Sequence, residues 1–121
     1  MNKEDVEQWC KENNHIVVDI SKRRIPVDVV MRIAEASTDI DDITRRTQRP
    51  QYYFARALAT SYLYKKIANN VISDMLGVGH DMVIYYKNQN LLELDLKYLK
   101  EWQRDSVTFF KARIEEIELS L

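Results

Sequence analysis

Three arginines lie within one short segment, TRRTQR, at Arg45, Arg46 and Arg49. A guanidinium group presents a planar fork of N–H donors that fits phosphate oxygens, and arginine is also favoured in a narrow minor groove, where the negative potential of DNA is enhanced. The spacing therefore predicts a loop that contacts the phosphates or the minor groove of duplex DNA. The alternative is a solvated loop whose cations balance the aspartates of residues 39–42.

A second polar set follows two glycines in the segment MLGVGHD. Gly77 and Gly79 predict a tight turn between a short helix over residues 70–76 and another that begins near His80. Two short helices joined in this way are typical of a helix-turn-helix, here about residues 70–88, whose second helix enters the major groove. The residues of the second helix that we expect to face DNA are His80, Asp81, Met82, Val83, Tyr86 and Lys87.

The first residues of that second helix offer different contacts to base edges. An imidazole can donate or accept a hydrogen bond, a carboxylate accepts from cytosine N4, and the side chains of Met82 and Val83 fit the methyl group of thymine. His80 and Asp81 have a simpler alternative role, which is to cap the N-terminus of the helix.

Arg56, Lys66 and Asn70 complete the set of expected DNA contacts. Arg56 is the one charged residue in a long apolar stretch. It is therefore equally well interpreted as a phosphate contact or as a buried ion-pair partner of Asp42 or Asp74. Asn70 can also cap the short helix that follows it, because its side-chain oxygen accepts from backbone N–H groups.

The elements that must position these residues are predicted to be helical throughout, in one all-α domain of residues 1–121. Pro26 and Pro50 each precede a helix-forming stretch, because the first helical position tolerates a missing N–H. Residues 1–25 are expected to form an N-terminal helix and an extended arm. The expected helices cover residues 3–13, Pro26 to Ala36, Pro50 to Ile67, 70–76, His80 onward and 93–119.

The stretch from Pro50 to Ile67 predicts the central helix of the bundle, because it is apolar nearly all round and rich in small residues. We interpret its aromatic side chains as core rather than as a platform on which bases stack. These aromatic residues are Tyr52, Tyr53, Phe54, Tyr62 and Tyr64.

The net charge of −1 hides an uneven distribution of charge along the chain. Residues 44–88 hold 7 Lys/Arg and 2 Asp/Glu, whereas residues 1–43 hold 6 and 10, and residues 89–121 hold 5 and 7. The basic block coincides with the predicted loop and helix-turn-helix. This coincidence favours a DNA-binding module flanked by acidic segments.

Other function classes find little support. The two histidines lie in different elements, the single cysteine has no partner thiol, and no nucleophile motif or metal-ligand spacing occurs. We therefore expect no catalysis, no metal site and no cofactor. No stretch is long and apolar enough for a membrane span, and the first residues lack the pattern of a secretion signal. The expected location is the cytoplasm, with nucleoid association if the chain binds DNA.

The C-terminal region carries an apolar stripe at helical spacing between acidic residues. It predicts an interface with a second copy of the chain or with a protein partner, and it supports the alternative function of a protein–protein interaction module that does not bind DNA. The stripe consists of Leu92, Leu96, Leu99, Trp102, Phe109, Phe110, Ile114 and Ile117.

The segments DIDDITRRTQRPQYYFARALATSYL and ISDMLGVGHDMVIYYK resemble a known family, the C-terminal DNA-binding domain of the bacterial replication initiator DnaA. That family runs as a helix, an aspartate-rich turn, a basic loop, a central helix with an R-x-x-A core and the signature I-G-x-x-F-G-G-R-D-H-T-T-V. The residues that match this framework are Arg56, Ala59, Ile72, Leu76, Gly77 and Ile84. The resemblance covers about residues 27–100 and implies a Trp-repressor-like fold with a helix-turn-helix.

The resemblance also implies roles for individual residues. The loop arginines would enter the minor groove, and residues 80–83 would read the major groove. The family's D-H-T-T is here the sequence HDMV, and the arginine before it is Gly79, so we expect a different DNA target. No G-x-x-x-x-G-K-[ST] motif of an ATPase occurs, and we expect a stand-alone module of a phage or mobile element.

Overall fold

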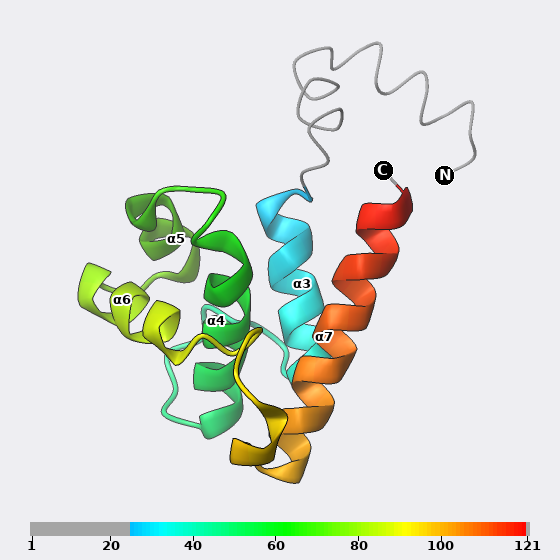
Figure 1. Ribbon diagram of the computed structural model, residues 1–121. Helices are drawn as coiled ribbons and strands as arrows, with labels where there is room; N and C mark the ends of the chain where they lie inside the picture. Colours follow the sequence, from blue (N-terminus) through cyan, green and yellow to red (C-terminus); the bar gives the residue numbers. More distant parts are fainter. Residues whose placement is uncertain (1–24, 121) are drawn as a thin grey trace.

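The computed structural model describes residues 25–120, which form helices joined by loops and contain no strand (Figure 1). The all-helical class is thereby confirmed for this part of the chain. The expected helix over residues 3–13, and the arm before Ile25, lie outside the described residues. The elements are α3 (Val27–Thr38), α4 (Pro50–Leu63), α5 (Asn69–Leu76), α6 (His80–Gln89), the short 3-10 helix η1 (Leu96–Tyr98) and α7 (Glu101–Ser120).

Both prolines stand at the predicted helix starts. Pro26 is the N-cap residue of α3, and Pro50 is the first residue of α4, where a missing N–H leaves no hydrogen bond unmade. α3 runs to Thr38, beyond the predicted end at Ala36. It ends there because Asp39 adopts the left-handed conformation with φ 56°, which aspartate tolerates better than most residues.

α4 is the central helix, as its composition predicts. It packs against α3, α5, α6 and α7, and in Figure 1 it lies between the α3–α7 pair and the α5–α6 pair. Every residue from Phe54 to Leu63 is buried. The helix ends at Leu63 rather than at the predicted Ile67, because the N–H groups of Lys66 and Ile67 both donate to the Leu63 carbonyl and form a turn.

The two glycines form the predicted turn between α5 and α6. Gly77 has a φ of 68°, a left-handed conformation that glycine adopts without steric cost, and its N–H donates to the Ser73 carbonyl. Asn70 lies within the first turn of α5. The N-cap residue is Ala68, and no side chain caps this helix, so the predicted capping role of Asn70 is wrong.

The C-terminal helix begins at Glu101, later than the predicted residue 93. The side chain of Gln103 accepts from the Lys100 N–H at 2.9 Å, which is the half of a capping box that fixes a helix start. The preceding connector runs from Asn90 to Lys100 and contains η1. Leu92, Leu96 and Leu99 therefore lie on this connector, half-buried against the core, and not on one helical stripe.

α7 packs along α3 and buries part of the predicted stripe within the chain itself. Val107, Phe110 and Ile114 are buried there, whereas Phe109 remains exposed. The stripe is thus chiefly a contact of the chain's own core. Within residues 25–120, no helix combines the length and the apolar character that crossing a membrane requires.

Candidate nucleic-acid interface

The arginine-bearing loop between α3 and α4 is fixed through the main chain of one residue. Ile43 is fully buried, its N–H donates to Glu35 Oε2 at 2.8 Å, and its carbonyl accepts from Arg56 Nε at 2.8 Å. Glu35 and Arg56 are themselves buried, on α3 and α4. A carboxylate and a guanidinium from two helices therefore satisfy both polar groups of the same buried residue, which would otherwise cost free energy.

Arg56 serves the loop and does not face solvent. Besides the Ile43 carbonyl, it donates through Nη2 to the Arg45 carbonyl. Among the described residues it forms no ion pair, with Asp42, Asp74 or any other acid. Both sequence interpretations of Arg56, a phosphate contact and a buried ion-pair partner, are thus corrected. Its partners are backbone carbonyls, which leave no signature in a sequence.

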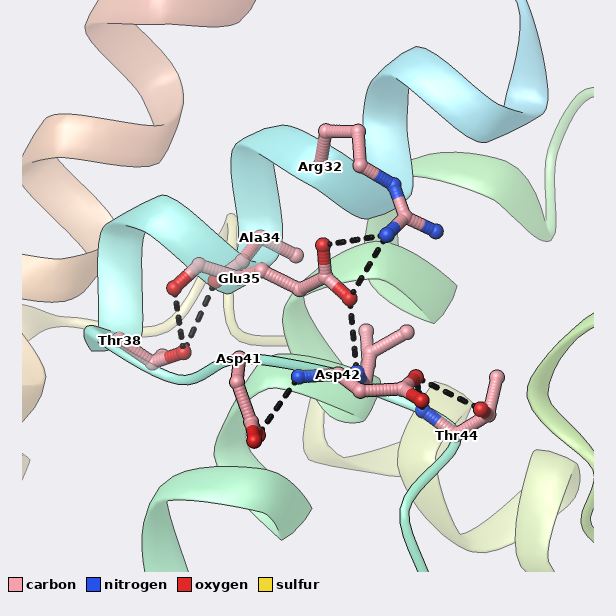
Figure 2. A network of polar contacts seen from close by, with 8 residues as sticks. Arg32, Ala34, Glu35, Thr38, Asp41, Asp42 and Thr44 are labelled. Atoms are coloured by element: carbon pink, nitrogen blue, oxygen red, sulfur yellow. Dashed lines mark hydrogen bonds and ion pairs between the residues drawn. The ribbon is translucent and has the colours of Figure 1, made fainter.

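The aspartates before the loop also stabilise its backbone. Figure 2 shows Glu35 paired with Arg32, at 2.9 Å, and Asp42 beside Thr44. Asp42 Oδ1 accepts from both the N–H and the hydroxyl of Thr44, at 2.9 and 2.6 Å, and this hydroxyl lowers the pKa of Asp42. The turn that leads into the loop is therefore built from local side-chain hydrogen bonds.

Asp41 connects the same turn to α4. The Tyr52 hydroxyl donates to Asp41 Oδ1 at 2.6 Å and keeps the pKa of Asp41 below its ordinary value. Asp41 Oδ2 also lies 2.5 Å from Arg45 Nη2. One of the three loop arginines is thus balanced by an aspartate, as the solvated-loop alternative predicts.

The other two loop arginines differ from Arg45 and from each other. Arg46 and Arg49 are exposed and pair with no acid among the described residues. Arg49 lines a hollow that it shares with three aspartates, Asp39, Asp41 and Asp105. Its charge is therefore surrounded by negative charge, and Arg46 is the loop arginine whose field is least compensated.

Some apolar residues of α6 face the core and others face solvent. Two of the predicted DNA contacts, Val83 and Tyr86, belong to the core. Val83 is 0% exposed and Tyr86 is 1% exposed, because these are the residues through which α6 packs on α4. Burial also raises the pKa of Tyr86. The prediction that Val83 and Tyr86 face DNA is therefore wrong, while their neighbours Ile84 and Tyr85 are 49% and 56% exposed.

The exposed face of α6 carries a mixture of polar and apolar side chains. The exposed residues of α6 are His80, Asp81, Ile84, Tyr85, Asn88 and Gln89. The predicted residues Met82 and Lys87 are half-buried at its edges. The N-cap residue of α6 is Gly79, and no side chain caps the helix, so the alternative capping role of His80 and Asp81 is absent in this structure.

The lysines of the basic block lie near the C-terminal end of α4, whereas the arginine loop precedes its N-terminal end. Lys65 pairs with Glu93 at 2.8 Å, Lys87 lies 5.3 Å from the ring centre of Tyr64, and Lys66 lies 4.6 Å from that of Tyr62. A 14-residue helix is about 20 Å long. Apart from the buried Arg56, the cations of the basic block, residues 44–88, therefore form two separate groups rather than one patch.

Lys66 and Asn70 lie on other elements than the loop and α6. The Tyr62 ring under Lys66 is turned toward α7, because its hydroxyl donates to Glu118 at 2.6 Å. Asn70 is exposed in the first turn of α5.

A groove of about 730 Å³ joins the loop to α6 and to the connector before α7. Gln48 and Pro50 line one side, Tyr85 and Gln89 another, and η1 contributes Tyr98. We call it the tyrosine groove, after its three exposed tyrosines, Tyr53, Tyr85 and Tyr98. The interpretation of the central aromatics as core is confirmed for the buried Tyr52, Phe54 and Tyr62 and for the partly buried Tyr64, but it is wrong for Tyr53.

Sequence reasoning missed this groove, because its residues come from three separate segments of the chain.

Comparisons of the chain with protein-family models, with curated proteins and with solved structures find no match. Within residues 25–120, no group of three or more His, Cys, Asp or Glu side chains is arranged to hold a metal ion. The functional argument therefore starts from the loop, the exposed face of α6 and the groove between them.

Proposed function

We propose that the protein binds duplex DNA, with α6 in the major groove and the arginine loop on the neighbouring phosphates or minor groove. The observation that carries the proposal is the exposed face of α6, which follows a tight glycine turn and lies beside a loop with an uncompensated arginine, Arg46. In this proposal α5 and α6 are the two helices of a helix-turn-helix. The sequence resemblance to the DnaA domain supports the same assignment.

The exposed face of α6 offers chemistry that suits base edges. The amide of Asn88 can pair with adenine through two hydrogen bonds, the carboxylate of Asp81 accepts from cytosine N4, and Ile84 fits the thymine methyl group. These contacts replace the predicted ones of Val83 and Tyr86. Arg46 and Lys87 then serve as sequence-independent contacts to phosphates.

A protein-interaction module is the second candidate, and a specific observation favours it. Four exposed apolar residues lie on the two short helices, Val71 and Met75 on α5 and Ile84 and Tyr85 on α6. Exposed apolar side chains on neighbouring helices also suit a protein partner. A related form of this proposal places the partner at the exposed Phe109 of α7. That partner is a second copy of the chain or another protein.

Fluorescence anisotropy with a labelled random duplex tests the first candidate. With about two to four cations near the proposed interface, the logarithm of affinity should fall with the logarithm of salt concentration at a slope of about −2 to −4. An absence of binding at ~50 mM salt would refute duplex binding. Light scattering of the free protein would separately detect a dimer.

Substitutions then separate positioning from sequence recognition. Arg46→Ala should weaken binding to every duplex and make the salt slope shallower by about 1, whereas Asp81→Ala should mainly change which sequences are preferred. Arg113→Ala is the matched control, because Arg113 is an exposed arginine of α7 that is already paired with Glu116. Equal losses for Arg46→Ala and Arg113→Ala would contradict the proposed orientation.

A further inference from the structure

The tyrosine groove has a lining whose chemistry differs from that of the hollow around Arg49, which three aspartates share. No charged side chain lines it. It combines exposed tyrosine rings with the amides of Gln48, Gln89 and Gln103, and its volume of about 730 Å³ lies within the range of small-molecule sites. A ligand that fits must therefore be uncharged within the groove, planar, and able to exchange hydrogen bonds with amides.

Two of the three exposed rings, Tyr53 and Tyr85, contact a third ring that is buried. Tyr86, which is buried, contacts Tyr53 and Tyr85 edge-on, with ring centres 6.4 and 6.1 Å apart. Tyr53 and Tyr85 thus have one edge against a buried ring while part of each remains exposed to the groove. Rings that are already ordered lose little conformational entropy when a ligand stacks on them.

One amide of the groove is oriented by a contact outside it. Gln103 Oε1 accepts from the Lys100 N–H at 2.9 Å, so its NH₂ group is the end that remains to donate. Ring nitrogens and carbonyl oxygens of nucleobases are acceptors for such a donor. Gln48 and Gln89 add an amide on each of two other segments.

One wall of the groove adjoins a cation that is not compensated. This wall is the end of the segment 44–50, in which Arg46 is exposed and pairs with no acid among the described residues. Lys97 lies 5.1 Å from the ring centre of Tyr98 but also 3.6 Å from Asp95, so its charge is balanced. An uncharged aromatic groove beside a basic segment is complementary to a ligand with a flat base and an attached anionic phosphate.

We propose that the tyrosine groove binds an unpaired nucleobase of a DNA strand, which stacks on the tyrosine rings while its phosphates lie along the arginine loop. The bases of an intact duplex are paired and stacked and cannot enter such a groove, so the site takes single-stranded DNA or a base that has left the helix. This site extends the proposed function of duplex binding. It rests on that function only because both sites use the arginine loop to contact phosphates.

A matched pair of single strands tests this site directly. One labelled strand of about ten nucleotides carries thymine bases, and the other has the same length and phosphates but abasic sugars. The strand with bases should bind between about fivefold and a hundredfold more tightly, because stacking on an aromatic side chain contributes that much per base. Equal affinity for the two strands would overturn the base site. This result is expected if the groove takes a protein segment instead of a base.

Substitutions assign the preference to the groove. Tyr98→Ala should lower the ratio of the two affinities, because one of the three exposed rings is lost, and Tyr98→Phe should preserve it, because phenylalanine keeps the stacking face. Tyr98 is 71% exposed, so its removal leaves the core intact, and circular dichroism verifies this. Phe109→Ala, an exposed aromatic on α7 outside the groove, is the control and should leave the ratio unchanged. An unchanged ratio for Tyr98→Ala would refute the assignment.

Binding of a blunt duplex, measured in parallel on the unaltered protein, separates the two proposals. A preference for the strand with bases in the absence of duplex binding would support the groove and refute the proposed function. Duplex binding without a preference for the strand with bases would support the proposed function and refute the base site in the groove.

Discussion

The loop between α3 and α4 and the helix α6 carry most of the residues proposed to face DNA, yet they are attached to the protein in opposite ways. The loop is fixed through hydrogen bonds to its main chain, from Glu35 and Arg56 to Ile43. α6 is fixed by two side chains, Val83 and Tyr86, which pack on α4. The three loop arginines therefore remain exposed although Ile43 itself is buried, whereas α6 uses two side chains from its middle for the core.

The largest expected effect concerns the attachment of the loop. Arg56→Met keeps an unbranched apolar stem but leaves the buried carbonyl of Ile43 without its donor, so the free energy of unfolding should fall by about 2 to 4 kcal/mol. Urea unfolding measures the change. Arg113→Ala is the control, since Arg113 forms only an exposed pair with Glu116, and it should change stability by less than about 0.5 kcal/mol. Equal effects would show that the loop does not depend on Arg56.

A smaller effect is expected for the attachment of α6. Val83→Ala should lower the free energy of unfolding by about 1 to 3 kcal/mol, because it leaves a cavity under the helix. At the next position, Ile84→Ala should change stability by only about 0.5 kcal/mol, because that side chain is half exposed. Urea unfolding of the two variants compares adjacent positions. The opposite order would mean that α6 packs on α4 through its other face.

The smallest effect concerns the Tyr52–Asp41 hydrogen bond, and it should depend on pH. The Tyr52 hydroxyl lowers the pKa of Asp41 below its ordinary 3.8, so the hydrogen bond stabilises the fold above that pH and is lost as Asp41 becomes protonated. Tyr52→Phe should therefore be less stable than the unaltered protein at neutral pH, and the difference should shrink below about pH 4. Unfolding in urea at both pH values measures it; a difference independent of pH would contradict a role for the carboxylate.

The sequence predicted the features of the fold that local chemistry decides. Pro26 and Pro50 marked the helix starts, and Gly77 marked the turn between α5 and α6, because each acts through its own backbone. The central position of α4 followed from its composition. These features depend on few residues, and those residues are adjacent in the chain.

The candidate site was harder to predict, because it depends on contacts between distant segments. Residues 82–86 are apolar without interruption, so periodicity alone cannot decide which side of α6 is buried, and Val83 was assigned to the wrong side. The lone Arg56 indicated a buried partner, but that partner is a loop backbone 13 residues earlier. The late start of α7 depends on Gln103, a capping signal that the apolar spacing before it obscured.

The way in which Ile43 anchors the loop bears on how the molecule could be re-engineered. Its hydrogen bonds run through main-chain atoms, its side chain is buried in the core, and its hydrogen-bond partners lie outside positions 46–48. The fold therefore places no demand on the side chains of Arg46 and Gln48, which are both exposed. A library randomised at these positions should keep its melting temperature while its members acquire different binding preferences. The same scaffold would then serve as a small helical framework for selecting new binders.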